Sequence, residues 1–89
     1  MKSRTTERFR KAFQSLPPSV QERAKAAYRL FLQNPFHPSL KFKQVHPTKP
    51  IYSVRITRYH RALGVREGDT ILWFWIGSHE EYERLLKEL

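Results

Sequence analysis

Residues 51–76 read IYSVRITRYHRALGVREGDTILWFWI, and this stretch decides the fold class. Residues 52–57 alternate apolar and polar side chains, and this period of two predicts a strand with one face in the core. Residues 61–66 predict a second strand, and a turn around Gly68 leads into a third. The third strand, residues 70–76, is apolar almost throughout, which is typical of a central strand covered on both faces.

Upstream of this stretch the apolar period changes to that of helices. A stripe through Phe9, Phe13 and Leu16 predicts a first helix, which begins after a capping threonine and ends at a pair of prolines. A second helix opens at Pro18 or Ser19 and ends at the Asn-Pro pair that follows its own apolar stripe. That stripe comprises Val20, Ala24, Ala27, Tyr28 and Phe31. The two helices are expected to form a hairpin with one buried face.

Two further segments complete the predicted elements. Residues 41–45 alternate basic or polar with apolar side chains and predict a strand, and residues 80–89 predict a short closing helix. Helices followed by strands indicate an α+β fold, with the helical hairpin packed on one face of a small antiparallel sheet. The chain is expected to form a single domain, residues 1–89, with Trp73 and Trp75 in its core.

The strong positive charge is the most informative bulk property. Seventeen Lys and Arg residues against eight Asp and Glu give a net charge of +9 on 89 residues. Such a field attracts polyanions, so nucleic acid is the first candidate partner and an acidic protein is the second. The alternative is a basic surface that serves solubility alone. The second face of the predicted sheet carries Arg55, Lys41 and Lys43, which makes it an open, basic candidate platform for RNA.

Other features narrow the compartment and the chemistry. The chain has no cysteine, no apolar run that could span a membrane and no apolar stretch behind its charged N-terminus, so a cytoplasmic protein is expected. Its four histidines lack the spacing of a zinc site, its three glycines form no phosphate cradle, and no paired acids lie on a strand. No metal ion or other cofactor is therefore expected.

Metal-free cleavage of RNA fits these residues, because RNA carries its own nucleophile in the 2′-hydroxyl. Such cleavage needs groups that move protons and cations that stabilise the charged transition state. His79 lies at a strand-to-helix junction, and imidazole titrates near neutral pH. Arg55 and Arg61 are candidates to hold the phosphate. The alternative for all three is a solvated surface position, and Arg61 shares strand parity with Leu63, which predicts a core-facing side chain.

Several segments, in this order and spacing, resemble toxins of the RelE/ParE superfamily. Residues 17–35 (PPSVQERAKAAYRLFLQNP) and 37–45 (HPSLKFKQV) are similar to the family's helical hairpin and next strand. Residues 51–67 (IYSVRITRYHRALGVRE) and 73–86 (WFWIGSHEEYERLL) are similar to its C-terminal half. The resemblance implies an antiparallel sheet with two helices on one face and a basic concave face opposite. The family's first strand is expected to be short or absent, since few residues precede the first helix.

The resemblance also implies roles for individual residues. Arg55 matches the basic residue of the family's Tyr-x-x-basic strand, and Arg61 matches the arginine that begins the following strand. Residues 77–79 (GSH) are similar to the Gly-Thr-His sequence of the YafQ-like branch, whose histidine is catalytic, whereas RelE-like members carry an arginine there. His79 is therefore the candidate catalytic histidine. The acid of that branch has no clear counterpart near Tyr59, so the proton-transfer pair stays unidentified.

RNA-binding residues are expected among the basic and histidine side chains of the strands and their connections. Lys41, Lys43 and His46 lie where the YafQ-like branch has further basic or histidine residues, although the connector lengths differ. Arg58 and His60 lie in a tight connection between two strands. The alternatives are solvated lysines on an edge strand and a simple turn with one packed aromatic side chain.

The sequence leaves three functions open. A RelE- or YafQ-like member would be an endoribonuclease (mRNA interferase) that cleaves mRNA, on the ribosome, and so inhibits translation. A ParE-like member would inhibit DNA gyrase by binding, without catalytic residues. A basic nucleic-acid-binding module without toxicity is the third. For the toxins, the resemblance implies a cognate antitoxin encoded beside the toxin, and a toxin–antitoxin complex that binds operator DNA to repress its own operon.

Overall fold

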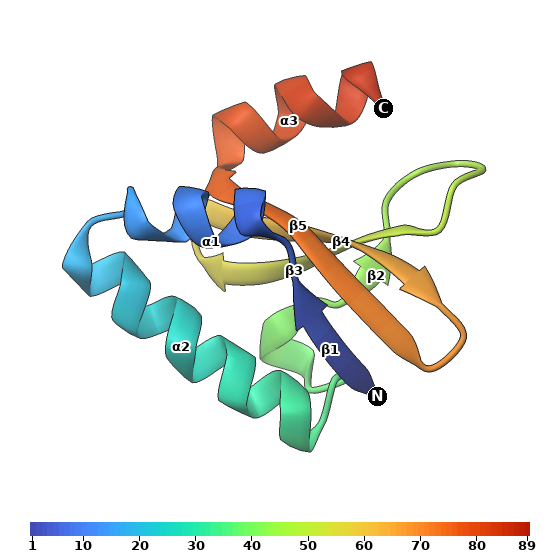
Figure 1. The fold of residues 1–89 in the computed structure, drawn as a ribbon, viewed down its shortest axis with the longest axis horizontal. Coiled ribbons are helices and arrows are strands. Elements are labelled where there is room, and N and C mark those ends of the chain that lie inside the picture. Colours follow the sequence, from blue (N-terminus) through green and yellow to red (C-terminus); the bar gives the residue numbers. More distant parts are fainter.

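The computed structural model describes residues 1–89 as a five-stranded sheet with helices on both of its faces (Figure 1). The elements are β1 (Lys2–Thr5), α1 (Glu7–Gln14), α2 (Pro18–Gln33), the 3-10 helix η1 (Pro38–Leu40), β2 (Lys43–Gln44), β3 (Ile51–Thr57), β4 (His60–Glu67), β5 (Thr70–Ser78) and α3 (His79–Glu88). The strand order is β1-β5-β4-β3-β2. The predicted α+β class and the interior position of the apolar strand β5 are thereby confirmed.

The sheet is mixed, because β1 runs parallel to β5 while every other pair is antiparallel. The parallel pairing extends from Lys2 opposite Thr70 to Thr5 opposite Trp73. Just beyond it, the Thr6 N–H donates to the Trp73 carbonyl at 3.0 Å. The expected first strand is thus present though short, since its four residues find a complete partner edge in β5.

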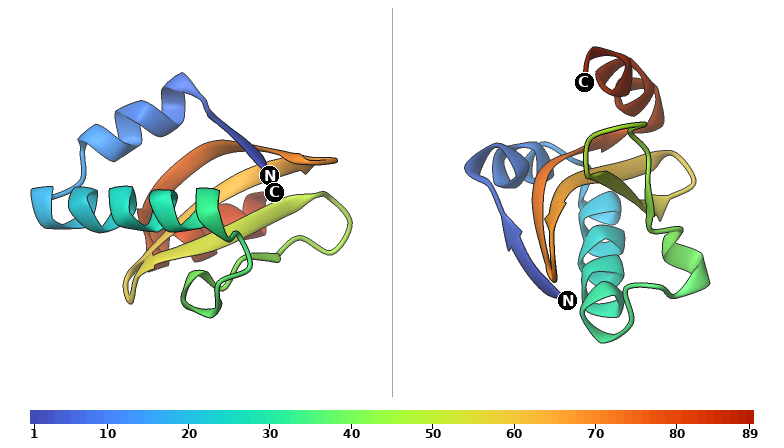
Figure 2. Two further views of the ribbon diagram at one scale, coloured as in Figure 1. Left: turned by 90° about the horizontal axis from the view of Figure 1, so that it is seen from below. Right: turned by 90° about the vertical axis from the view of Figure 1, so that its right-hand side faces the viewer.

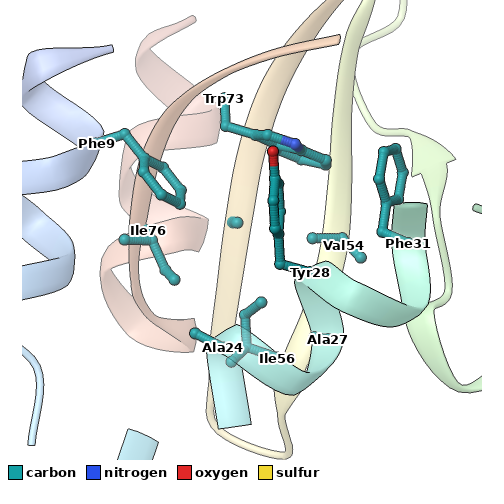
Figure 3. A pocket seen from close by; sticks show the side chains of 10 residues that line it. Phe9, Ala24, Ala27, Tyr28, Phe31, Val54, Ile56, Trp73 and Ile76 are labelled. Atoms are coloured by element: carbon teal, nitrogen blue, oxygen red, sulfur yellow. The ribbon is translucent and has the colours of Figure 1, made fainter. Parts of the chain in front are cut away.

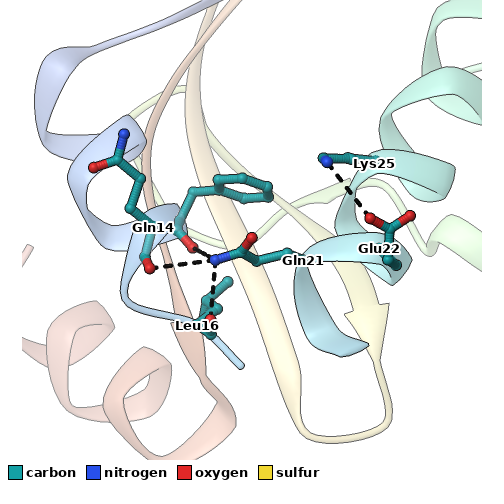
Figure 4. Close-up of polar contacts among 6 residues, drawn as sticks. Gln14, Leu16, Gln21, Glu22 and Lys25 are labelled. Atoms are coloured by element: carbon teal, nitrogen blue, oxygen red, sulfur yellow. Dashed lines mark hydrogen bonds and ion pairs between the residues drawn. The ribbon is translucent and has the colours of Figure 1, made fainter. Parts of the chain in front are cut away.

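The predicted hairpin of α1 and α2 covers one face of the sheet (Figure 2). Thr6 caps the start of α1, as predicted. At the other end of α1, the side-chain nitrogen of Gln21 reaches across from α2 and donates to the carbonyls of Phe13, Gln14 and Leu16 at 3.0–3.2 Å (Figure 4). Carbonyls at a helix C-terminus have no partner within their own helix. One side chain therefore bonds several carbonyls at the end of α1 and ties the two helices of the hairpin together.

The core under the hairpin is built from the predicted apolar stripes. Phe31 meets Trp73 edge-on, with ring centroids 5.3 Å apart, and each side chain is 2% exposed. Between α1, α2 and the sheet lies a cavity of about 30 Å³ that is lined only by apolar residues, among them Phe9, Val54 and Ile76 (Figure 3). A space of this size has room for about one water molecule. It is a packing gap, so the binding surface must be sought elsewhere.

Strand β5 buries its two tryptophans on opposite faces of the sheet. Strand residues two apart ordinarily share a face, yet Trp73 packs under the hairpin while Trp75 belongs to the cluster on the other face. The register between β4 and β5 shifts between Leu63 and Gly64, and this bulge reverses the alternation of faces. Gly64 is required beside the bulge, because a Cβ atom there would lie 2.8 Å from the Trp73 ring.

The expectation of an open second sheet face is wrong. Ile51, Leu63 and Trp75 form an apolar patch on that face, and α3 lies over this face (Figure 2). Tyr82 and Leu85 of α3, and Leu89 just after it, pack against the patch. The physical reason is that three large apolar side chains would otherwise lie in water. The closing helix, predicted correctly as an element, folds back over them. None of the helices combines the length and the hydrophobicity needed to cross a membrane.

Candidate active site

Arg55 and Arg61 lie directly opposite each other on the antiparallel strands β3 and β4. Opposite residues of such a pair point to the same face of the sheet. Here it is the face of α3, because Leu63, two residues after Arg61, belongs to the patch beneath that helix. Arg61 therefore points to the same covered face as Leu63, as the alternation along the strand predicts. Its side chain starts on a covered face, and it reaches the surface because β4 begins here, at the end of the sheet.

Backbone carbonyls of the β3–β4 turn hold the Arg61 guanidinium. Its Nη1 donates to the Thr57 carbonyl at 2.7 Å and to the His60 carbonyl at 2.9 Å. None of the four ion pairs in the structure includes Arg61 or Arg55. The turn thus positions one guanidinium rigidly and leaves the charges of both without a carboxylate partner.

The electrostatics of this arginine pair are unfavourable in the absence of an anion. Burial lowers the pKa of Arg61 below its ordinary value, the neighbouring charge of Arg55 lowers it further, and Tyr82 acts in the opposite direction. Two adjacent cations without a counter-ion repel each other, so an anion placed between them would be stabilised. A phosphate group fits this requirement, because guanidinium groups bind phosphate oxygens in pairs.

His79 is the first residue of α3 and lies at the same end of the sheet. Its N–H donates to the Tyr59 carbonyl at 2.7 Å, which ties the start of α3 to the β3–β4 turn. Its ring stacks on Tyr82, with centroids 5.6 Å apart and planes inclined by 21°. The ring nitrogen Nε2 lies 3.2 Å from Glu83 Oε1, and Nδ1 is enclosed without a hydrogen-bond partner. The imidazole is thus fixed in orientation. Its Nε2 is occupied by Glu83, and its Nδ1 is shielded from solvent.

Two of the predicted RNA-binding residues shape the β3–β4 turn. His60 Nδ1 lies 2.8 Å from Thr57 Oγ1, which also accepts the Tyr59 N–H at 3.1 Å. The His60 ring is therefore engaged in the turn itself. Arg58 is exposed, and its guanidinium carbon lies 5.6 Å from the centre of the Tyr59 ring. Of the two, Arg58 is the residue with free donors close to Arg61.

The predicted strand over residues 41–45 is wrong in extent, since β2 comprises only Lys43 and Gln44. Lys41 ends η1 in a left-handed conformation with φ of 47°, which a continuous strand excludes. Lys41 and Lys43 therefore do not alternate along one strand. Lys43 is exposed and pairs with Ser53, which places it on the face that carries Arg55.

The structure places His46 apart from the arginine pair. Its Nδ1 accepts the N–H groups of Thr48 and Lys49 at 3.1 and 2.9 Å, so the ring closes the connector after β2. This connector adjoins the start of β3, roughly 20 Å along the strand from Thr57 at its other end. His46 and the Arg55–Arg61 pair thus lie at opposite ends of the sheet.

Sequence reasoning missed Tyr82 and Glu83 as neighbours of His79. They follow it by three and four residues, which is the spacing that brings side chains together on one helix face. Tyr82 also packs against the apolar patch beneath α3, so its place in the apolar stripe of the helix conceals its contact with His79. No three His, Cys, Asp or Glu side chains gather closely enough to hold a metal ion.

Comparisons with known proteins agree with this architecture. Residues 18–84 match the family model of the ParE-like toxin domain. No protein with a curated description matches the sequence. The structure of YafQ from E. coli strain BL21(DE3) superimposes with a TM-score of 0.72 at 10% identity, over 91% of this chain and 96% of that one.

Two further solved structures share the fold. The RelB–RelE antitoxin–toxin complex from Methanococcus jannaschii gives a TM-score of 0.70 at 19% identity, over 92% of this chain and 96% of the matched one. The YoeB/ParE toxin from Agrobacterium tumefaciens gives 0.67 at 20% identity, over 89% and 99%. These likenesses concern the fold, whereas the family model matches most of the sequence. The chain therefore belongs to the ParE-like toxin domain family, within the RelE/ParE superfamily of toxins.

Proposed function

We propose that this chain is the toxin of a type II toxin–antitoxin system and an endoribonuclease that cleaves mRNA on the ribosome, in the cytoplasm, and so inhibits translation. The observation that carries the proposal is the unneutralised pair of Arg55 and Arg61 at the sheet end where His79 lies. The β3–β4 pairing sets the two arginines opposite each other, and the bond to the Tyr59 carbonyl ties His79 to the same turn. Membership of the family supports the assignment as a toxin.

The proposed chemistry uses the nucleophile of the RNA itself. The 2′-oxygen attacks the adjacent phosphorus, the new 2′-O–P bond forms and the P–O5′ bond breaks, which leaves a 2′,3′-cyclic phosphate and a free 5′-hydroxyl. The 2′-hydroxyl loses its proton to a base, and the departing 5′-oxygen gains one from an acid. His79 performs one of these transfers. Arg55 and Arg61 hold the phosphate and stabilise its developing negative charge, so the cleavage is metal-independent.

His79 must release Glu83 before its Nε2 can reach an RNA strand. The Glu83 side chain is 63% exposed, and an exposed pair of this kind contributes only about 0–1 kcal/mol. Rotation of Glu83 into solvent is therefore inexpensive and frees Nε2. Tyr82, stacked on the imidazole, keeps the ring plane oriented during this change.

A cognate antitoxin is the second partner that the proposal includes. The Methanococcus jannaschii relative was solved as an antitoxin–toxin complex. We extend this arrangement to the present chain and assign the antitoxin an acidic segment, which would supply the counter-charge that Arg55 and Arg61 lack. The exposed side chains of Lys41, Lys43 and Arg58 would contact further phosphates of the mRNA. The toxin–antitoxin complex would also bind operator DNA.

Cell-free translation with mapping of new mRNA ends tests the nuclease. With the unmodified protein we expect new ends that carry 5′-hydroxyls, and with His79→Ala a cleavage rate lower by a factor of about 100 or more. Arg29→Ala is the matched control, because it removes an exposed arginine of α2 that lines a separate hollow between α1 and α2. Undiminished cleavage by His79→Ala would contradict the role of His79. Intact mRNA with the unmodified protein would contradict the nuclease itself.

Inhibition of DNA gyrase by binding is a second candidate function, as the resemblance implies for ParE-like members. The state of His79 favours it, since Nε2 is bonded to Glu83 and Nδ1 is enclosed. A supercoiling assay with the same proteins separates the two functions. Equal inhibition of supercoiling by the unmodified protein and by His79→Ala, with mRNA left intact, would establish the binding role.

A further inference from the structure

We propose that a hollow between α2, η1 and β3 binds one nucleotide of the RNA, next to the phosphate that is cleaved. The hollow has a volume of about 410 Å³ and is open to solvent. This size lies within the range of about 300–1,000 Å³ that is typical of small-molecule sites. The identity of the ligand as RNA rests on the proposed function, whereas the hollow and its charges are features of the structure.

Two arginines line the hollow, Arg23 from α2 and Arg55 at the uncovered edge of β3. Neither takes part in an ion pair. The acidic residue next to Arg23 in the sequence, Glu22, is already bonded to Lys25 at 3.5 Å (Figure 4). The guanidinium groups of Arg23 and Arg55 are therefore available for a phosphate, which each can bind with two parallel hydrogen bonds.

Small and aliphatic side chains make the rest of the hollow wide and apolar. Ala26 and Ala27 lie one helical turn after Arg23, and Leu30 lies one turn further, so the four residues follow one stripe of α2. Ile56 contributes from β3, whose outer edge is uncovered here because β2 pairs only with the first half of that strand. An apolar surface of this kind suits the face of a base, since stacking removes apolar area from water.

Ser39 of η1 adds a hydrogen-bond acceptor to the rim of the hollow. The Ser39 hydroxyl lies 2.8 Å from His37 Nδ1, and the Ser39 N–H points to the same nitrogen at 3.2 Å. In either tautomer of His37, Ser39 Oγ keeps a lone pair that can accept from a ribose hydroxyl. In an RNA occupant, a ribose hydroxyl is the group that would donate to Ser39.

Arg55 connects the hollow to the active site. It lines the hollow, and it also lies opposite Arg61 in the β3–β4 pair. When a phosphate of the RNA is held between Arg55 and Arg61, the next nucleotide of that RNA is therefore within reach of the hollow. The hollow would select that nucleotide and would set which bond of the mRNA meets His79.

Binding of a fluorescent single-stranded RNA hexanucleotide, measured by anisotropy in the His79→Ala background, tests the inference. We expect Arg23→Gln to weaken binding by about 10-fold or more, since a hydrogen bond to a charged group is lost. Ala26→Phe should weaken it similarly by filling the hollow, and Ala26 is exposed, so the core is untouched. Arg29→Gln is the matched control on the same helix and should change affinity by less than about two-fold. In protein that retains His79, Arg23→Gln should raise KM by a larger factor than it lowers kcat.

The outcomes separate this inference from the proposed function. Unchanged RNA binding by both Arg23→Gln and Ala26→Phe, with mRNA cleavage retained, would overturn the hollow as a nucleotide site and leave the nuclease standing. Absence of RNA binding together with intact mRNA would overturn both. A hexapeptide of glutamate that binds more tightly than the RNA, with the same sensitivity to Arg23→Gln, would assign the hollow to an acidic protein and overturn its assignment to RNA.

Discussion

The two faces of the sheet are covered in different ways. Under α1 and α2 the core cluster contains eight buried residues, whereas the cluster beneath α3 contains three and α3 itself has no buried residue. Hydrophobic stabilisation grows with the apolar area removed from water. The hairpin face therefore supplies most of the stability, and the face of α3 carries Arg55, Arg61 and His79. A fold stabilised on one face can accommodate mutually repelling cations on the other.

Phe31→Ala should give the largest loss and so tests the hairpin side of this comparison. We expect the free energy of unfolding to fall by about 3–5 kcal/mol, because a buried ring in contact with Trp73 and Phe42 is replaced by a cavity. Leu32→Ala is the control, since Leu32 is 50% exposed and its truncation should cost less than about 0.5 kcal/mol. Urea unfolding followed by circular dichroism measures both. Equal losses for the two variants would contradict the comparison.

Gln21→Ala tests whether the hairpin depends on the single side chain that closes it. The carbonyls of Gln14 and Leu16 would lose the donor that Gln21 supplies, whereas the Phe13 carbonyl keeps the Leu16 N–H at 3.1 Å. We expect a loss of about 1–2 kcal/mol, since water replaces part of the bonding. Gln14→Ala serves as the control, because the Gln14 side chain is exposed and only its backbone carbonyl takes part. A loss in Gln14→Ala as large as in Gln21→Ala would show that the amide bonds are not responsible.

Leu85→Ala tests the weaker cover of the second face. Leu85 is only half-buried against the patch of Ile51, Leu63 and Trp75, so we expect a loss of about 1 kcal/mol. The amides of α3 should also exchange with solvent faster than those of α2 in the unmodified protein, because fewer buried contacts hold α3 in place. Hydrogen exchange followed by NMR measures this difference. Equal protection of the two helices would contradict the assignment of α3 as the weaker cover.

Arg55→Gln should give the smallest change, and a change in the opposite direction. Removal of the charge next to Arg61 relieves repulsion at a partly exposed site, so we expect a gain of about 0.5 kcal/mol. For a domain of this size such a gain corresponds to roughly 2–4 °C in Tm. Inorganic phosphate should raise the Tm of the unmodified protein and have less effect on the variant. A lower Tm for Arg55→Gln would show that Arg55 stabilises the fold.

The dependence of this gain on pH follows from the sign of the shift. The pKa of Arg61 in the folded state lies below its ordinary value, so the protonated side chain lowers the free energy of unfolding at every pH below the folded-state pKa. This destabilisation disappears only as the pH rises through the folded-state pKa, in the alkaline range. At neutral pH it is fully present, so the gain from Arg55→Gln should be the same at about pH 6 and about pH 8. Thermal melts at the two pH values measure this.

Much of the fold could be predicted because the deciding signals are local. The stripes of α1 and α2 identify these helices by their period, and the short apolar run of β5, which follows a turn, identifies that strand. The short extent of β2 could not be predicted, because it depends on the left-handed conformation of Lys41. For the site, His79 and the arginines were identified by position and by family resemblance. Their present neighbours Tyr82 and Glu83 were not, because an apolar stripe and a catalytic face share one helical period.

By itself the sequence determined the α+β class, the helical hairpin, the apolar inner strand and the basic character of the surface, since each follows from the spacing or number of side chains. Only the tertiary structure decided which face each residue meets. The bulge beside Gly64 puts Trp73 and Trp75 on opposite faces, and α3 covers the face that the sequence predicts to be open. Periodicity describes which residues share a side of an element, whereas register shifts and long-range packing decide what lies against that side.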